Sequence, residues 1–562
     1  MGRQLSPGSW SGTAWLSLTL FLSQAPVIAA PPQVTHLFPP GGQRGTKIEV
    51  VLHGTFTWPV RVWAPGITVT VKKESGKLEV DIPADLPADR VWFRFFNDEG
   101  ASAPHPFLIG NLKEFAEKEP NNTIKTAQVC PGSAVTVNGA LTAGDVDCYS
   151  VPLKAGQTLV AALDANTRLG SPIDAILQIV SSRGVVLGDN HDDLGLDPRL
   201  AYRAEQDGNY VVRLFAFPST PGTDIRFGGA ANAVYRLTLT TGPYITHAIP
   251  RSVFLDRPGK VEVRGWNIPP RTEAPVRSYL DARPEGFQEC EPLGDIRAPA
   301  GTRAGLAFLR DHAGFAPLRL QPITSNLVHA DASRPMDLPT LPVSITGCLM
   351  KPGREDEYRL PLKKGQHILL ILESSSMDYL LDPVLGLADP DGKQVAEVDD
   401  TGESRDVVLE HTASRDGIYR IQVSDRYRQG GDRHGYLLTV RPVEPDFELA
   451  LAADSLVVTP GKPVDLTVKV KRRTGSGKTP GSIRIELMGL PSGVTAPAVV
   501  SEPSGPTSAS VTLKITSTGP GFSGPIRVVG RAKDPTPIER TARTPAQLGI
   551  CFDYLWLTTR PK

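Results

Sequence analysis

The side chains best suited to chemistry are carboxylates and amides in two short segments. The first segment holds Glu117, Glu119, Asn121 and Asn122, and the second holds Asp145 and Asp147. Calcium binds about six to eight oxygen atoms from carboxylates, amides and water. If the first segment folds back onto the Gly144–Tyr149 turn, these oxygens meet. The sequence therefore predicts a calcium site formed by all six residues, and the alternative is a solvated linker followed by a tight Gly-Asp turn.

A further acidic turn contains Asp189, Asp192 and Asp193, and it has a counterpart at Asp399-Asp400. Clustered carboxylates can bind a cation. Asp and Asn side chains also bond to their own backbone in turns. We therefore favour hairpin capping for these residues, with cation binding as the alternative.

Tryptophan residues offer a different kind of binding surface. Trp58, Trp63 and Trp92 fall in one domain, and Trp266 occupies the matching region of a later one. Such rings could stack on a sugar or a peptide, but tryptophan more often belongs to the core of a small β domain. The sequence favours the core interpretation.

Motifs of common enzyme classes are missing. The ten histidines form no His-Glu-x-x-His motif and no other pair with metal-ligand spacing. There is no Gly-x-Ser-x-Gly nucleophile elbow, and no cysteine stands in a recognisable nucleophile context. We therefore predict that the chain is not an enzyme.

The elements that must position these residues occur twice along the chain. The segment Tyr149-Ser-Val-Pro-Leu-Lys-Ala-Gly-Gln157 recurs as Tyr358-Arg-Leu-Pro-Leu-Lys-Lys-Gly-Gln366, and Val34-Thr-His36 recurs as Ile245-Thr-His247. The offsets are nearly equal, so we infer that a pair of domains was duplicated. Repeated β modules usually build a scaffold or a binding surface, whereas an active site is usually unique.

Length and composition agree with a chain of β domains. A chain of 562 residues is too long for one core and predicts about four or five domains. The 53 glycines and 52 prolines separate short β-branched runs, as in all-β proteins. Sixty basic residues balance sixty acidic ones without a basic block, which argues against nucleic-acid binding.

The N-terminus predicts a secretory signal peptide at 1–29. Arg3 precedes the apolar run Ala14–Leu22, and Val27-Ile-Ala29 is a small-residue cleavage site. The alternative is an uncleaved anchor, but Ser23, Gln24 and Pro26 shorten the apolar run. No later segment is long and apolar enough to cross a membrane. We expect a secreted or periplasmic protein of the cell envelope, without a transmembrane span in the mature chain.

Export permits disulfides. The five cysteines are an odd number, so at least one is unpaired within the chain. Cys130 and Cys148 fall in one module, where they either bridge adjacent strands or pack as small buried hydrophobic residues.

Residues 111–242 carry the most specific pattern. Glu117-Lys-Glu-Pro-Asn-Asn122 precedes Gly144-Asp-Val-Asp147-Cys-Tyr149, and Asp207-Gly-Asn-Tyr210 follows. This order resembles the bacterial pre-peptidase C-terminal (PPC) domain, a β-sandwich of exported proteins. In related collagen-binding modules a similar leader and acidic turn hold calcium, and the resemblance extends to Glu117, Glu119, Asn121, Asp145 and Asp147. The resemblance thus implies the same calcium site.

Residues 344–443 resemble a second PPC domain. Asp356 and Tyr358 match Asp147 and Tyr149, but Arg354 replaces Asp145 and the Glu-x-Glu-Pro-Asn leader is absent. We therefore expect no calcium site in this copy.

The remaining segments resemble immunoglobulin-like domains. Residues 30–110 and 243–343 are similar to the IPT/TIG fold, through Gly45-Thr-Lys-Ile-Glu-Val50 and Gly259-Lys-Val-Glu-Val263. Residues 444–562 form a last immunoglobulin-like domain, with a typical loop at Gly489–Val494. The predicted fold class is all-β, with tandem β-sandwich modules that are immunoglobulin-like and PPC jelly-roll-like.

Together these features predict an elongated, secreted, non-catalytic binding or scaffold protein of the bacterial envelope or exterior. Calcium would stiffen the joint between the first two domains. Its partner would be a protein or a polysaccharide at the cell surface. Because PPC domains often accompany peptidases, the alternative is a secreted hydrolase or the accessory subunit of one.

Overall fold

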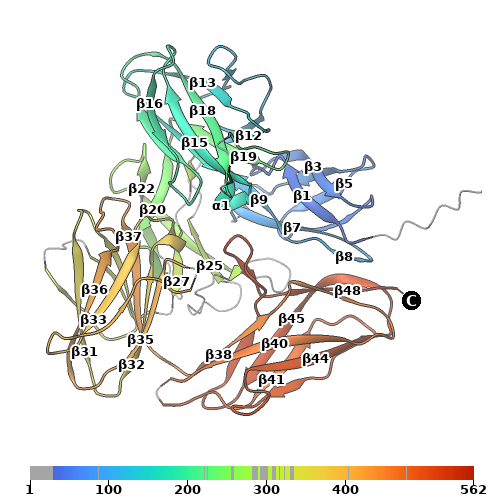
Figure 1. Cartoon of the computed structure of the whole chain (residues 1–562), viewed down its shortest axis with the longest axis vertical. Helices are drawn as coiled ribbons and strands as arrows, with labels where there is room; N and C mark the ends of the chain where they lie inside the picture. Colours follow the sequence, from blue (N-terminus) through green and yellow to red (C-terminus); the bar gives the residue numbers. More distant parts are fainter. Residues whose placement is uncertain are drawn as a thin grey trace, which may run out of the picture.

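The structure is a computed structural model that describes residues 30–562 except for a set of short segments. The segments left out are 87, 221, 224–225, 255–258, 281–288, 291–301, 307–311, 315–316, 322, 330–333, 403, 476 and 562. The predicted signal peptide, 1–29, lies outside the described residues. Within them, helical structure is limited to α1 (Asn166–Leu169) and the 3-10 turn η1 (Ser375–Met377). No described helix is long and apolar enough to span a membrane. The chain is all-β and forms tandem β-sandwich modules (Figure 1).

The first domain packs two sheets around Phe93, Phe95 and Phe107. One sheet has the order β1 (Gln33–Phe38), β3 (Lys47–Thr55), β6 (Lys77–Asp81) and β5 (Thr68–Val71). The other has the order β2 (Gly41–Gln43), β9 (His105–Gly110), β7 (Arg90–Asn97) and β4 (Arg61–Trp63), with β8 (Gly100–Ala101) paired to β7.

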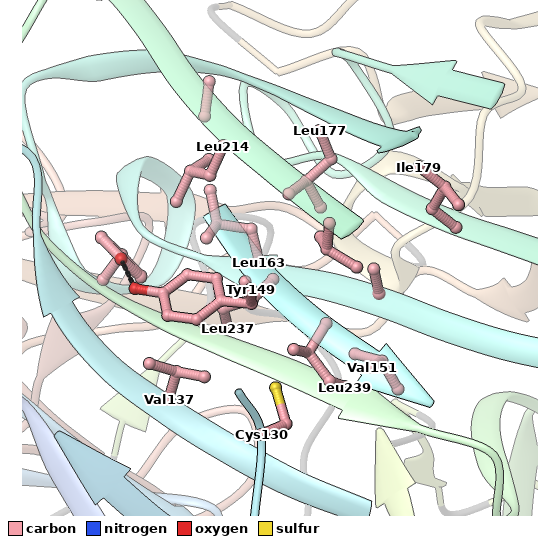
Figure 2. Close-up of a cluster of buried hydrophobic side chains, with 14 of the residues drawn as sticks. Cys130, Val137, Tyr149, Val151, Leu163, Leu177, Ile179, Leu214, Leu237 and Leu239 are labelled. Carbon is pink, nitrogen blue, oxygen red and sulfur yellow. Dashed lines mark hydrogen bonds between the residues drawn. The ribbon is translucent and has the colours of Figure 1, made fainter. Parts of the chain in front are cut away.

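The first PPC-like unit consists of two five-stranded sheets. One has the order β10 (Lys113–Ala116), β12 (Ala134–Ala140), β19 (Val234–Thr240), β14 (Thr158–Asp164) and β17 (Arg199–Arg203). The other has the order β11 (Gln128–Val129), β13 (Asp147–Leu153), β18 (Gly208–Pro218), β15 (Ile173–Val180) and β16 (Val186–Asn190). Alternate side chains of both sheets fill the core, where Tyr149 lies among Val137, Leu163 and Leu237 (Figure 2).

The second PPC-like unit repeats this strand order. One sheet runs β28 (Ser325–Val328), β30 (Val343–Cys348), β37 (Gly435–Pro442), β32 (His367–Glu373) and β35 (Val407–Thr412). The other runs β29 (Met336–Asp337), β31 (Glu355–Leu362), β36 (Gly417–Asp425), β33 (Pro383–Ala388) and β34 (Gln394–Val398).

The second unit therefore begins before residue 344, which corrects the boundary expected there. β28 pairs in parallel with β30, as β10 does with β12 in the first unit. A leader strand is thus present in both units, although its sequence differs. The strand β28 lacks the acidic motif that follows β10 in the first unit. Without that motif, the boundary predicted from the sequence assigned β28 to the preceding domain.

The third domain shares a local irregularity with the first. Its strands β20 (Tyr244–Ile249) and β22 (Lys260–Trp266) pair with a register shift between Ile245 and His247, matching the shift between Val34 and His36. Other strands of the domain are β23 (Glu273–Leu280), β25 (Thr302–Leu306), β26 (Ala313–Gly314), β21 (Ser252–Phe254) and β27 (Arg319–Gln321). The shared bulge supports the duplication inferred from the sequence.

The C-terminal domain is another two-sheet sandwich. One sheet has the order β38 (Asp446–Leu451), β40 (Val464–Arg473), β44 (Ser510–Ser517) and β42 (Val494–Thr495). The other has the order β39 (Ser455–Val458), β48 (Leu555–Thr559), β45 (Phe522–Ala532), β41 (Ile483–Met488) and β43 (Val499–Ser501), with β46 (Ile538–Thr541) at β45.

The first and last domains lie side by side (Figure 1), so the expectation of an elongated chain is wrong. Trp92 meets Phe552 edge-on, with ring centroids 5.2 Å apart. Trp63 packs on Trp556 at 5.7 Å. Buried Arg94 pairs with Asp454 at 2.6 Å. The sequence could not reveal this contact, because aromatic residues at an interface between domains look like core residues of either domain.

Candidate metal centre

Two strands from different sheets bring the predicted carboxylates together. Glu117 directly follows β10, and its backbone N–H donates to the carbonyl of Asn138 on β12 at 2.9 Å. Asp147 is the first residue of β13, in the facing sheet. The candidate site therefore lies between the two sheets of the first PPC-like unit. It is at the end where the leader, residues 117–122, leaves β10 and passes to the facing sheet.

The leader folds back onto the Gly144–Tyr149 turn. The carbonyl of Asn121 accepts the N–H of Cys148 at 3.1 Å. The N–H of Asn121 donates to Oε2 of Glu119 at 2.8 Å, which holds the leader in a tight loop. The predicted fold-back is thus present, and it brings the two acidic segments together.

Three carboxylates converge at this point. Glu117, Glu119 and Asp147 each offer an oxygen, and these oxygens lie within 4.8 Å of one another. Asp147 is fully buried, Glu117 is partly buried and Glu119 is exposed. Within the described part of the chain, no Lys or Arg side chain pairs with any of the three. The cluster is closed on the inside and open to solvent at Glu119.

Two buried oxygens at the site have no hydrogen-bond partner among the described residues. They are Oδ1 of Asn121 and Oδ1 of Asp147, and both side chains are 0% exposed. Asn121 uses its Nδ2 on Oε1 of Glu117 at 3.4 Å, so its Oδ1 remains an available acceptor. Buried polar atoms without partners are rare and costly in folded proteins. Here both belong to the residues predicted to bind calcium.

Two tyrosines support the carboxylates from the core. The hydroxyl of Tyr235 donates to Oδ2 of Asp147 at 2.6 Å and lies 3.3 Å from Oε1 of Glu117. The hydroxyl of Tyr149 contacts that of Tyr235 at 2.5 Å. A Cβ atom at Gly139 would come within 2.3 Å of the Tyr235 hydroxyl and 2.9 Å of Glu117 Oε2. Gly139 therefore makes room for this arrangement.

Burial and mutual repulsion disfavour the negative charges of the cluster. Burial, followed by the nearby charge of Glu117, raises the pKa of Asp147. Burial also raises the pKa of Glu119, as do the charges of Asp145 and Glu117. A proton or a bound cation would lower the electrostatic free energy of these buried, mutually repelling carboxylates. Hard oxygen ligands of this type suit calcium.

Asp145 and Asn122 are used differently from the other predicted ligands. Both oxygens of Asp145 accept hydrogen bonds, Oδ1 from Asn122 Nδ2 at 2.6 Å and Oδ2 from the Thr142 hydroxyl at 3.0 Å. The N–H of Val146 also donates to Oδ1, at 2.9 Å. These two side chains hold the leader against the turn, beside the converging oxygens.

The matching place in the second unit contains different chemistry. The N–H of His329 donates to the carbonyl of Thr346 at 2.9 Å, so His329 occupies the position of Glu117. Its Nδ1 lies 2.8 Å from the Tyr358 hydroxyl and 3.7 Å from Oδ2 of Asp356. Arg354 pairs with Oδ1 of Asp356 at 3.2 Å. Asp356, the counterpart of Asp147, is therefore already compensated by protein side chains.

Sequence reasoning missed the tyrosine pair and His329 as parts of these sites. Tyr149 lies two residues after Asp147, so both side chains point to the same face of the strand. The same spacing recurs at Asp356 and Tyr358. That repeat was a usable signal for the tyrosine, whereas His329 had no detectable motif around it.

One residue of the other acidic turn, Asp193, makes an interdomain contact. Asp193 is buried and pairs with Arg199 of its own unit and with Arg433 of the second unit. Asp399, in the second copy, pairs with Arg426. Two guanidinium groups already neutralise Asp193, so neither hairpin capping nor cation binding describes it. Asp189 and Asp192 are exposed, and hairpin capping stays the prediction for them.

Three of the tryptophans and the two cysteines of the first PPC-like unit also have defined places. Trp63 and Trp92 belong to the interface with the C-terminal domain, and Trp266 packs on Tyr244 at 5.6 Å. Cys130 faces the core between the sheets (Figure 2), whereas Cys148 packs with Val180 and Val211 on the opposite face. Both thiols are free, as expected for small buried hydrophobic residues. Burial raises the pKa of Cys130 to about 12 and that of Cys148 to about 11.

No family model and no curated protein match the chain. Similar solved structures include the pre-peptidase C-terminal domain of a collagenase from Bacillus anthracis, at 15% identity and a TM-score of 0.16, which covers 20% of this chain and 100% of that one. PliG, a periplasmic lysozyme inhibitor from Aeromonas hydrophila, matches at 15% identity and a TM-score of 0.16, over 21% and 98%. The N-terminal four Ig domains of Dscam1 isoform 4.44 match at 9% identity and a TM-score of 0.16, over 92% and 96%. At these values the likenesses carry no argument about function.

Proposed function

We propose that this chain is a non-catalytic, exported binding or scaffold protein in which calcium fixes the leader of the first PPC-like unit. Glu117, Glu119, Asn121 and Asp147 would hold the ion, and water would complete the shell. Asn122 and Asp145 would position the leader. The observation that carries this proposal is the pair of buried, unpartnered oxygens, Asn121 Oδ1 and Asp147 Oδ1, beside three converging carboxylates.

Calcium at this place would act inside the first PPC-like unit, on the loop between β10 and β11, and not on the joint with the first domain that the sequence suggested. The joint has a protein contact of its own, because Arg168 pairs with Asp89 of the first domain at 2.5 Å. A pair inside the unit, Arg236 with Glu114 at 2.6 Å, holds β10 to β19. The loop after Glu117 is held by hydrogen bonds, and its described residues make no ion pair with another side chain. A cation bound there would add a fixed link between β10 and β11, which lie in different sheets.

The proposed role of the assembled domains is recognition of a protein or polysaccharide at the cell surface. Duplicated β-sandwiches suit a scaffold better than an active site, which is usually unique. Export through the predicted signal peptide belongs to the same proposal. A calcium site of this kind would suit the exterior, where calcium is plentiful enough for weak sites.

Limited trypsin digestion of the mature chain tests the proposal. Lys118 and Lys125 are exposed in the leader loop, and Lys154 is exposed in a hairpin away from the site. We expect calcium to slow cleavage at Lys118 and Lys125 but not at Lys154, and Asp147→Ala to abolish that protection. Asp207→Ala, at an exposed ion pair with Lys154, should keep it. Equal cleavage of the parent chain with calcium and with a chelator would overturn the proposal.

A further inference from the structure

Two cysteines from distant parts of the chain are direct partners in a β-ladder. The short strand β24 (Glu289–Cys290) of the third domain pairs antiparallel with β47 (Cys551–Phe552) of the C-terminal domain. In this register Cys290 is opposite Cys551, and Glu289 is opposite Phe552. No sequence motif predicted the pairing, since 260 positions separate the two cysteines along the chain.

The ladder sets a backbone separation that a disulfide can span. Residues directly opposite in an antiparallel pair have Cα atoms about 4.5 Å or about 5.5 Å apart, depending on the hydrogen-bonding position. Disulfides join residues whose Cα atoms are about 4.4–6.8 Å apart. Either type of pair therefore allows the bond without movement of the strands.

The other cysteines have no such arrangement. Cys130 and Cys148 are buried on opposite faces of their sheet. The half-buried Cys348 donates its thiol to the carbonyl of Gly431 at 3.3 Å. Cys551 is half-buried and free in this structure. One bond between Cys290 and Cys551 would leave Cys130, Cys148 and Cys348 as free thiols.

We propose that Cys290 and Cys551 form a disulfide that ties the third domain to the C-terminal domain. The two thiols lose two protons and two electrons as the sulfur–sulfur bond forms. The electrons pass to an external disulfide, such as that of a thiol oxidoreductase or oxidised glutathione, which is reduced to two thiols. The inference does not depend on the calcium site.

The strand that carries Cys551 belongs to a hairpin that also contacts the first domain. The N–H of Thr544 donates to the carbonyl of Phe552 at 2.9 Å, closing a hairpin. The Gln547 side chain of this hairpin donates to the carbonyl of Pro104 in the first domain at 2.6 Å. Phe552 also packs against Trp92 of the first domain. A bond from Cys551 to the third domain would therefore lock three domains together at one hairpin.

Peptide mapping of the full mature chain in an oxidising glutathione buffer tests this inference. We expect a linked peptide containing Cys290 and Cys551, which disappears on reduction. Alkylation of the denatured chain should label three thiols before reduction and all five after it. Cys290→Ser and Cys551→Ser should each remove the linked peptide, and Cys348→Ser, the matched control, should keep it.

The map of the parent chain decides the question even if a variant fails to fold. Five labelled thiols before reduction would overturn the inference. A bond from Cys551 to another cysteine of the same chain, or to a second chain, would overturn it as well.

Discussion

The two PPC-like units share one frame and differ at the point where the leader meets the acidic turn. Each has a buried aspartate at the start of a strand, Asp147 or Asp356, that accepts a tyrosine hydroxyl, from Tyr235 or Tyr436. In the first unit the leader adds further carboxylates and leaves buried oxygens without partners. In the second unit the leader contributes His329, and Arg354 faces the aspartate.

The comparison indicates two solutions to the same electrostatic problem. A buried carboxylate is costly unless a positive group or hydrogen bonds compensate it. The second unit supplies the compensation from its own side chains. In the first unit the described residues supply only hydroxyl, amide and backbone donors, and we propose that an external cation completes it. One unit would then be permanently formed, and the other would depend on calcium.

The largest expected effect is the loss of the internal compensation in the second unit. Asp356→Ala leaves Arg354 and His329 facing a gap, and breaking a buried pair in this way costs about 3 kcal/mol. Hydrogen exchange of β31 and β36 amides should accelerate equally with and without calcium. Asp416→Ala, at an exposed ion pair with Lys363, should leave exchange unchanged. Unaltered protection in Asp356→Ala would show that the pair does not stabilise the unit.

The next effect concerns calcium and the first unit. A ligand at 100 times its Kd stabilises the folded state by about 2.7 kcal/mol. At that calcium concentration we expect hydrogen exchange in β12 and β13 to slow by about 100-fold. Asp147→Ala should remove this response. The amides of β30 and β31 in the same sample are the internal control. A calcium response of equal size in both units would contradict the comparison.

A smaller effect is expected from the glycines beside the tyrosines. A Cβ at Gly139 meets the Tyr235 hydroxyl at 2.3 Å, and a Cβ at Gly347 meets Tyr436 Cζ at 2.1 Å. Gly139→Ala and Gly347→Ala should each destabilise their unit by about 1–3 kcal/mol, because the tyrosine must move. Only Gly139→Ala should also weaken calcium binding, measured by titration calorimetry, since the same Cβ displaces Glu117. Equal calcium affinity in Gly139→Ala and the parent would show that the space at Gly139 is not needed for calcium binding.

The smallest expected effect is a gain of response in the second unit. The double variant His329→Glu with Arg354→Asp restores the acidic residues of the first unit at matching positions. Without calcium, hydrogen exchange of β31 should be faster than in the parent, and calcium should reverse part of this loss. The single variant Arg354→Ala, which adds no carboxylate, should lose protection without regaining it in calcium. A double variant that ignores calcium would show that the leader loop, beyond these two positions, decides whether a cation binds.

The sequence predicted much of the fold because both copies of the repeat have similar strand and turn residues in the same order. It also predicted that Glu117, Glu119 and Asp147 would meet, since the acidic segment at 117–122 and the Gly144–Tyr149 turn follow each other in the order of the pattern that residues 111–242 resemble. It could not distinguish converging residues such as Asn121 from supporting ones such as Asp145, because both carry suitable oxygens and only the hydrogen bonds separate them.

Contacts between distant parts of the chain were beyond the sequence. His329 takes the place of Glu117 through a backbone ladder, and no residue pattern around it announces that role. Trp92 packs on Phe552 only because the intervening domains bring the first and last domains together. Such pairings arise from tertiary geometry, and composition and spacing do not encode them locally.

Equilibrium dialysis of the full mature chain against calcium measures how many calcium ions each chain binds. We expect one bound calcium ion per chain, which is lost in Asp147→Ala and retained in Asp356→Ala. Binding that survives Asp147→Ala, or a parent chain that binds no calcium, would contradict the proposed calcium site.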